Sequence, residues 1–167
     1  MSASPAQIAL DAPAVRIGVE TAFEAEAVDA LVLGAFGPGR FAKTAERFRE
    51  GVAPAVGFTA HEGGRLIGSV RLWNIAIDGL PALFLGPIAV SARARRAGVG
   101  AELVAACVDE ARRRGASGVL LVGDPPYFSR FGFEAAPQVR LPGPVDRRRV
   151  MWLPMTVAAP EGLAVPA

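Results

Sequence analysis

The chain has 167 residues, of which 51% are apolar, and its formal net charge is +2, so it suits one globular domain with a sizeable core. Its one histidine, His61, and its one cysteine, Cys107, exclude a metal site built on such side chains and an intrachain disulfide. No charge-free apolar stretch is long enough to span a membrane, and residues 1–14 lack a secretory signal pattern, so we expect a cytoplasmic protein without a metal.

The first half of the chain is predicted to hold three strands and two helices. Residues 15–20 alternate between apolar and polar side chains, as a half-buried strand does. Thr21 and Glu24 have the spacing of a capping box and predict the start of a helix. The other elements expected here are a second amphipathic helix at 41–50 and a hairpin of strands at 56–61 and 65–74.

The second half begins with a long apolar strand, 82–90, that Gly86 and Pro87 interrupt. Because proline cannot donate to a sheet ladder, this dipeptide predicts a bulge or a splay in the strand. Residues 98–114 give the clearest helical pattern, with Cys107 on its apolar face. The other elements expected here are a buried strand at 118–123, a short helix capped by Asp124, and strands at 133–139 and 150–157.

This order of elements predicts an α/β (α+β) fold, with a mixed, mostly antiparallel sheet of about six to seven strands and helices on both faces. We expect a single domain over residues 14–157. Residues 1–13 are expected to form a flexible N-terminus, and residues 158–167 a frayed tail.

Arginine supplies nearly all of the positive charge, since Lys43 is the only lysine, and it clusters at 93–96, 112–114 and 147–149. A modest net charge with local basic clusters favours a small anionic ligand over a long nucleic acid. The clusters alone also suggest nucleic-acid binding, but the sequence has no recognised module of that kind, so we expect no nucleic-acid partner.

The strongest chemical signal lies between the strand that ends near Val90 and the helix that starts near Gly98. Gly98 and Gly100 let backbone N–H groups approach a ligand closely, and a helix N-terminus presents unpaired N–H groups to phosphate. A P-loop is absent, and a dinucleotide fingerprint fits poorly because Leu103 takes the place of its third glycine. The alternative is a helix start that merely tolerates glycine, with arginines on a solvated face.

Residues 86–133 resemble the GNAT superfamily of acyl-CoA-dependent N-acetyltransferases, in particular a branch of small bacterial proteins. Arg95, Gly98 and Gly100 match the superfamily's R/Q-x-x-G-x-G/A loop, and Gly132 and Phe133 match its later G-F pair. The resemblance implies a sheet splayed between its fourth and fifth strands, acetyl-CoA as cosubstrate and no metal. Homodimers are common in the family, but no segment of this sequence identifies an interface.

The resemblance also implies where acetyl-CoA binds. The backbone of Ile88, Ala89 and Val90 would pair with the pantetheine arm, and Phe128 would lie at the same site. The residues implied to hold the pyrophosphate are Arg95, Arg96, Ala97, Gly98, Val99, Gly100 and Ala101. Residues 36–48 and the C-terminal strands would form the acceptor pocket.

The general acid is open. In the family a tyrosine five places before the phenylalanine of the G-F pair protonates the departing thiolate, but this place holds Phe128, which has no proton to donate. Its neighbour Tyr127, the only tyrosine, is the candidate catalytic residue, although one residue along a helix turns a side chain by about 100°. Ser129 is displaced the opposite way. Alternatively no side-chain acid acts, because a thiol with a pKa of about 8.5 leaves as thiolate with modest help.

The general base is open as well, since the strand residues 82–86 carry no carboxylate. Asp78 and Asp124 are the nearest candidates, but a turn residue and a helix cap are simpler explanations for them. His61 beside a Gly-Gly turn is expected to be solvated. Trp73 is expected either to pack in the sheet or to line the acceptor side.

The sequence thus predicts an N-acetyltransferase that transfers an acetyl group from acetyl-CoA to a primary amine of a small molecule or peptide, by direct attack in a ternary complex. The alternative is a non-catalytic acyl-CoA-binding sensor, because Phe128 replaces the acid. The sequence does not identify the acceptor.

Overall fold

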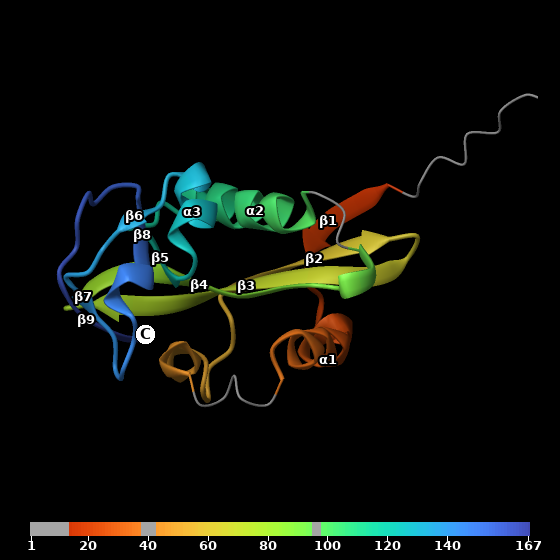
Figure 1. Ribbon diagram of the computed structural model, residues 1–167, viewed down its shortest axis with the longest axis horizontal. Coiled ribbons are helices and arrows are strands. Elements are labelled where there is room, and N and C mark those ends of the chain that lie inside the picture. Colours follow the sequence, from red (N-terminus) through yellow and green to blue (C-terminus); the bar gives the residue numbers. More distant parts are fainter. Residues whose placement is uncertain (1–13, 38–42, 95–97) are drawn as a thin grey trace, which may run out of the picture.

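The computed structural model describes residues 14–37, 43–94 and 98–167 and places helices on both faces of one sheet. In Figure 1, α2 (Val99–Arg113) and α3 (Pro125–Phe128) cover one face, and α1 (Ala25–Phe36) lies against the other. The sheet is mixed and mostly antiparallel, which confirms the predicted fold class. It has nine strands within the described ranges, more than the six to seven expected.

The strands are β1 (Val15–Val19), β2 (Val56–Glu62), β3 (Arg65–Ile77), β4 (Leu80–Val90), β5 (Gly118–Val122), β6 (Glu134–Ala135), β7 (Val139–Arg140), β8 (Val150–Pro154) and β9 (Gly162–Pro166). They follow the order β1-β2-β3-β4-β5-β8-β6, and β9 pairs with β3 and β7. Two 3₁₀ turns matter for the site, η3 (Thr44–Phe48) and η6 (Arg147–Arg149).

The first and third helices begin at capping residues that the sequence predicts. The Glu24 carboxylate accepts the Thr21 backbone N–H at 2.7 Å, as a capping box requires, and η1 (Ala22–Glu24) leads into α1. The Asp124 carboxylate accepts the Tyr127 backbone N–H at 3.3 Å and caps α3. Both predicted helix starts are therefore confirmed.

The apolar face of α2 forms the larger core with the sheet. Leu103, Val104 and Cys107 are fully buried there, and burial raises the pKa of the Cys107 thiol, so this cysteine is an unreactive core residue as predicted. A second cluster on the opposite side of the sheet includes Phe48 and Phe84, whose ring centroids lie 4.6 Å apart. Each fully buried large side chain contributes about 1.5–3 kcal/mol of transfer free energy.

The long central strand β4 contains the predicted bulge. Leu85 pairs with Leu72 and Ile88 pairs with Val70, so two residues of β4, Gly86 and Pro87, face a single residue of β3. The indole nitrogen of Trp73 donates to the Gly86 carbonyl at 2.6 Å and holds the bulge in place.

Arg71 is the β3 residue that faces the bulge, and it joins the sheet to α1. Its guanidinium donates to Glu20 at 2.6 Å and 3.0 Å and to Asp29 of α1 at 2.9 Å. The side chains of Arg71 and Glu20 are only 13% and 8% exposed, so this ion pair is largely shielded from solvent.

Strands β4 and β5 pair only briefly. Their parallel ladder consists of Leu83 with Val119 and Phe84 with Leu120, directly before the bulge. Beyond it β5 continues to pair with β8 as far as Val122. The sheet is therefore splayed between its fourth and fifth strands, as predicted.

The prediction of a frayed tail over residues 158–167 is wrong for the second half of that segment. Residues 162–166 form β9, which pairs antiparallel with β3 and parallel with β7. Asp78, in the β3–β4 turn, fixes the strand: its carboxylate accepts the Leu163 N–H at 3.0 Å, and its own N–H donates to the Leu163 carbonyl at 3.1 Å. A short run of alanine, valine and proline gave no strand signal of its own.

The prediction of an amphipathic helix at 41–50 is also wrong. Its described part contains only the 3₁₀ turn η3, and residues 41 and 42 lie outside the described ranges. The strands predicted at 133–139 and 150–157 exist but are shorter, as β6, β7 and β8.

Asp78 gives a direct test of the C-terminal strand. Its φ is 44°, a conformation that asparagine tolerates well. We expect Asp78→Ala to lower the free energy of unfolding by about 1–2 kcal/mol, because the Leu163 N–H loses its acceptor. Asp78→Asn keeps an oxygen acceptor and should cost less than about 0.5 kcal/mol. Urea unfolding measures both, and an Asp78→Ala variant as stable as the parent protein would contradict the docking of β9.

Candidate functional site

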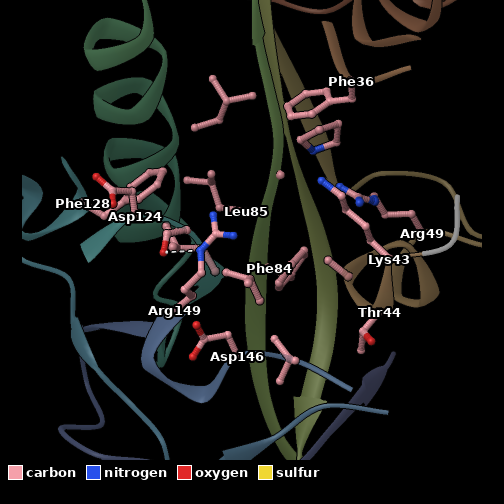
Figure 2. Close-up of a pocket in the computed structure, with 18 of the residues that line it drawn as sticks. Phe36, Lys43, Thr44, Arg49, Phe84, Leu85, Asp124, Phe128, Asp146 and Arg149 are labelled. Carbon is pink, nitrogen blue, oxygen red and sulfur yellow. Dashed lines mark hydrogen bonds between the residues drawn. The ribbon is translucent and has the colours of Figure 1, made fainter. Parts of the chain in front are cut away.

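A cavity of about 540 Å³ opens where β4 and β5 separate. Figure 2 shows its lining residues, which come from segments far apart in the sequence. The bulge of β4, the end of β5 and α3 form its centre, and α1, η3 and the loop before β8 form its walls. The residues that line it in these parts are Phe84–Ile88, Leu121–Asp124, Phe128, Phe36, Lys43–Ala45, Arg49, Pro144–Asp146 and Arg149.

The wall of the cavity is closed by contacts between segments about a hundred residues apart. The Thr44 hydroxyl donates to the Pro144 carbonyl, and Arg47 donates to the Pro142 carbonyl. Gly143 is required between these two carbonyls, since a Cβ there would lie 2.9 Å from the Thr44 hydroxyl oxygen. The turn η3 and the loop before β8 therefore form one continuous wall.

The interior of the cavity is mostly apolar, and five charged side chains line it. Lys43, Arg49 and Arg149 are cationic, and Asp124 and Asp146 are anionic. Apolar walls with a few polar groups are typical of sites for small molecules. The cavity can therefore bind a small ligand that has both apolar and charged parts.

Most of these charges already have partners. Asp146 forms an ion pair with Arg148 at 3.0 Å, and this hydrogen bonding holds the pKa of the Asp146 carboxyl below its ordinary value. Arg49 pairs with Glu46 at 2.9 Å, and the Nε of Arg149 donates to the Gly123 carbonyl at 3.3 Å.

Helix α2 starts directly after Gly98, as the sequence predicts. Gly98 caps the helix with a φ of 106°, which a residue with a side chain rarely adopts. The first N–H bonded within the helix is that of Glu102, which donates to the Gly98 carbonyl at 2.9 Å. Among the described residues, the N–H groups of Val99, Gly100 and Ala101 have no carbonyl four residues earlier to bind, and such a helix start is suited to bind an anion. Arg95, Arg96 and Ala97, predicted for the same site, lie outside the described residues.

Tyr127 and Phe128 lie at different parts of the site. Phe128 lines the cavity, whereas Tyr127 does not. A Cβ placed on Gly100 would lie 3.0 Å from the Tyr127 hydroxyl oxygen, so this hydroxyl lies at the start of α2. The guanidinium of Arg130 covers the ring of Tyr127 at 4.6 Å. The two neighbouring residues therefore face different points, as the turn of a helix requires.

Ile88 and Phe128 are the predicted cosubstrate residues that reach the cavity itself. Ala89 and Val90 follow Ile88 along β4 and pair with Ser69 and Gly68 of β3. Their strand has no ladder with β5 beyond Phe84 within the described residues. That edge of β4 is therefore available to an extended ligand.

The candidate bases lie in different places. Asp78 is at the far end of β3, bound to β9, and does not line the cavity. Asp124 lines the cavity but also caps α3. His61 is only partly exposed, at 31% of its side chain, and its Nε2 lies 3.1 Å from the Glu24 carboxylate. Trp73 is buried and packs at the bulge, so it does not line the acceptor side.

Sequence reasoning missed Arg149 and Asp146 as residues of the site. They belong to the basic stretch 146–149, which carried no signal except charge. The only indication was position, because the stretch directly precedes the apolar strand β8 at the edge of the splay.

The described ranges contain neither a metal-binding cluster nor a membrane-spanning helix. They contain no group of three or more histidine, cysteine, aspartate and glutamate side chains arranged to hold a metal ion. Every described helix is too short or too polar to cross a bilayer.

The family model described as the acetyltransferase (GNAT) family matches residues 25–133. The uncharacterized N-acetyltransferase YhbS of Escherichia coli is 32% identical over 123 residues, which cover 72% of this chain and 74% of that protein. The crystal structure of YhbS in complex with CoA superposes with a TM-score of 0.80 at 26% identity, over 100% of this chain and 94% of that one.

A GNAT family acetyltransferase from Brucella melitensis, solved in complex with acetyl-CoA, has a TM-score of 0.73 to this chain. The match covers 92% of this chain and 96% of that one at 22% identity, and it shows a shared fold.

Proposed function

This chain belongs to the GNAT family of acetyltransferases, and we propose that it transfers an acetyl group from acetyl-CoA to a primary amine of a small molecule or peptide. The observation that carries the proposal is the pairing of two features: a glycine-bearing helix start at α2 and a cavity where β4 and β5 separate. The CoA complex of YhbS, which aligns with the whole chain, supports acetyl-CoA as the cosubstrate.

We assign the phosphates of the cosubstrate to the start of α2. The N–H groups of Val99, Gly100 and Ala101 are suited to the pyrophosphate, and Gly98 and Gly100 leave room for it. The motif assigns Arg95, Arg96 and Ala97 to the same group. The free edge of β4 at Ile88, Ala89 and Val90 is suited to pair with the pantetheine arm as a neighbouring strand would. Phe128 is assigned to the acyl end, because it lines the cavity.

The reaction needs little from the protein beyond positioning. Acetyl-CoA supplies an activated carbonyl carbon when it is bound. The amine nitrogen forms a bond to this carbon, the carbon–sulfur bond breaks, the sulfur leaves with its electron pair, and the nitrogen loses a proton. The apolar interior of the cavity, including Phe84, Leu121 and Phe128, limits the access of water to the thioester.

We keep Tyr127 as the proposed general acid, but its position favours a role in binding the cosubstrate. Its hydroxyl lies at the start of α2 beside Gly100, where it is suited to contact the cosubstrate. A thiol with a pKa of about 8.5 can leave as thiolate without a side-chain acid. Asp124 is the carboxylate at the cavity that we propose as a base, acting through solvent.

One alternative function has an observation of its own. Phe128, which lines the cavity, has no proton to donate, and this would suit a non-catalytic acyl-CoA sensor. Release of free thiol that depends on an amine would exclude the sensor. A single domain, a cytoplasmic location and a homodimer remain predictions.

The helix start is tested by Gly100→Glu, which puts a carboxylate where we place the phosphates. We expect it to weaken acetyl-CoA binding in calorimetry by at least about 100-fold, because like charges repel at close range. Gly34→Glu is the matched control, since Gly34 is an exposed residue of α1 with open space around its Cα. Equal affinity of the two variants for acetyl-CoA would show that its phosphates do not bind at this helix start.

The role of Tyr127 is tested by Tyr127→Phe in steady-state kinetics. We expect KM for acetyl-CoA to rise severalfold and kcat to fall less than about tenfold, because the hydroxyl lies at the helix start. A fall in kcat of roughly 10²- to 10⁴-fold at constant KM would instead identify Tyr127 as the general acid.

A further inference from the structure

Two cations that line the cavity, Lys43 and Arg149, form no ion pair with a described carboxylate. Asp146 is paired with Arg148, although Arg149 is also near enough to help lower the pKa of the Asp146 carboxyl, and the Asp124 carboxylate accepts the Tyr127 N–H at the start of α3. The ammonium of Lys43 lies over the ring of Phe36, 5.8 Å from its centroid.

Arg149 has donors to spare. Its Nε binds the Gly123 carbonyl, and no described residue accepts a hydrogen bond from its two terminal nitrogens. The bond to Gly123 fixes the stem of the side chain and leaves the planar fork of the guanidinium beside the cavity. Such a fork matches the geometry of a carboxylate.

The two cations reach the cavity from opposite walls. In Figure 2, Arg149 approaches beside Leu85 from one side of the view, and Lys43 with Arg49 from the other. The lining of the cavity is mostly apolar and includes Phe84, Leu121 and Phe128. A ligand suited to this space has an apolar body and an anionic group at its periphery.

We propose that the acceptor is an amine that also carries a carboxylate, such as an amino acid with an apolar side chain, and that Arg149 binds this carboxylate with support from Lys43. This inference rests on the proposed acetyl transfer and names its substrate class. The positive charges of Lys43 and Arg149 in the cavity disfavour polyamines and lysine-rich peptides, because their additional ammonium groups would be repelled. Arg149 therefore determines specificity and takes no part in the chemistry.

The anionic group could also belong to the acyl donor, because a dicarboxylic acyl-CoA would place a carboxylate in the same cavity. The two sources are distinguished by varying the donor and the acceptor separately. The acceptor probes are phenylalanine, leucine and methionine against their decarboxylated counterparts 2-phenylethylamine, 3-methylbutylamine and 3-(methylthio)propylamine. The donor probes are acetyl-CoA and succinyl-CoA.

The experiment measures kcat/KM by release of free thiol for the parent protein and for Arg149→Gln, Arg149→Lys and Arg147→Gln. Arg147 is the matched control, since it is an exposed arginine of the same turn η6 and does not line the cavity. We expect Arg149→Gln to lower kcat/KM for the amino acids by about tenfold and for the amines without a carboxylate by less than about twofold. Arg149→Lys should restore part of the loss, and Arg147→Gln should change neither value.

For each variant, kcat/KM for the amino acid is divided by kcat/KM for its decarboxylated amine. This ratio is compared between variants, so the different basicities of the two kinds of amine cancel. An equal loss for both kinds of amine would overturn the inference and make Arg149 structural. Sensitivity to Arg149 that appears only with succinyl-CoA would assign the anion to the donor and overturn it as well. Turnover of simple amines without preference for a carboxylate refutes this inference alone, whereas the absence of amine-dependent thiol release with every acceptor refutes the proposed function.

Discussion

The bulge at Gly86 and Pro87 is the constraint on which the rest of the structure depends. Two residues of β4 face one residue of β3, proline has no N–H to donate, and the Trp73 indole holds the Gly86 carbonyl. The ladder between β4 and β5 therefore ends at Phe84 and Leu120. Because β5 remains paired with β8, the two strands separate and a cavity opens between them instead of a continuous sheet.

Different elements line the two sides of this opening. On one face, α2 is fixed by a fully buried apolar stripe, and its glycine-capped start lies beside β4, where the Cβ of a residue at position 100 would be 4.0 Å from Val90. On the other face, η3 and the loop before β8 are joined through the Pro142 and Pro144 carbonyls and carry the charged side chains. The cosubstrate that we propose would lie along the first side, and the acceptor against the second. A rigid sheet thus holds two binding regions at a fixed separation.

The sequence predicted the parts of the fold that short-range signals determine. Gly86 and Pro87 indicated the bulge, the capping residues Thr21 and Asp124 indicated two helix starts, and Gly98 indicated the start of α2. It could not predict β9 or Arg149, because both depend on partners far along the chain. Residues 162–166 become a strand through β3 and Asp78, and Arg149 enters the site through its bond to Gly123. The wall of the cavity likewise depends on the contact of Thr44 with Pro144, a hundred residues away in the chain.

In the function that we propose, the cavity brings an amine to the thioester carbonyl of acetyl-CoA. The rate of free thiol release, when the purified protein is mixed with acetyl-CoA and a panel of primary amines, tests this directly. We expect release that saturates in both substrates and forms one acetylated amine per thiol. Tight binding of acetyl-CoA without amine-dependent release across the panel would contradict it, and would leave a protein that binds acyl-CoA without using it.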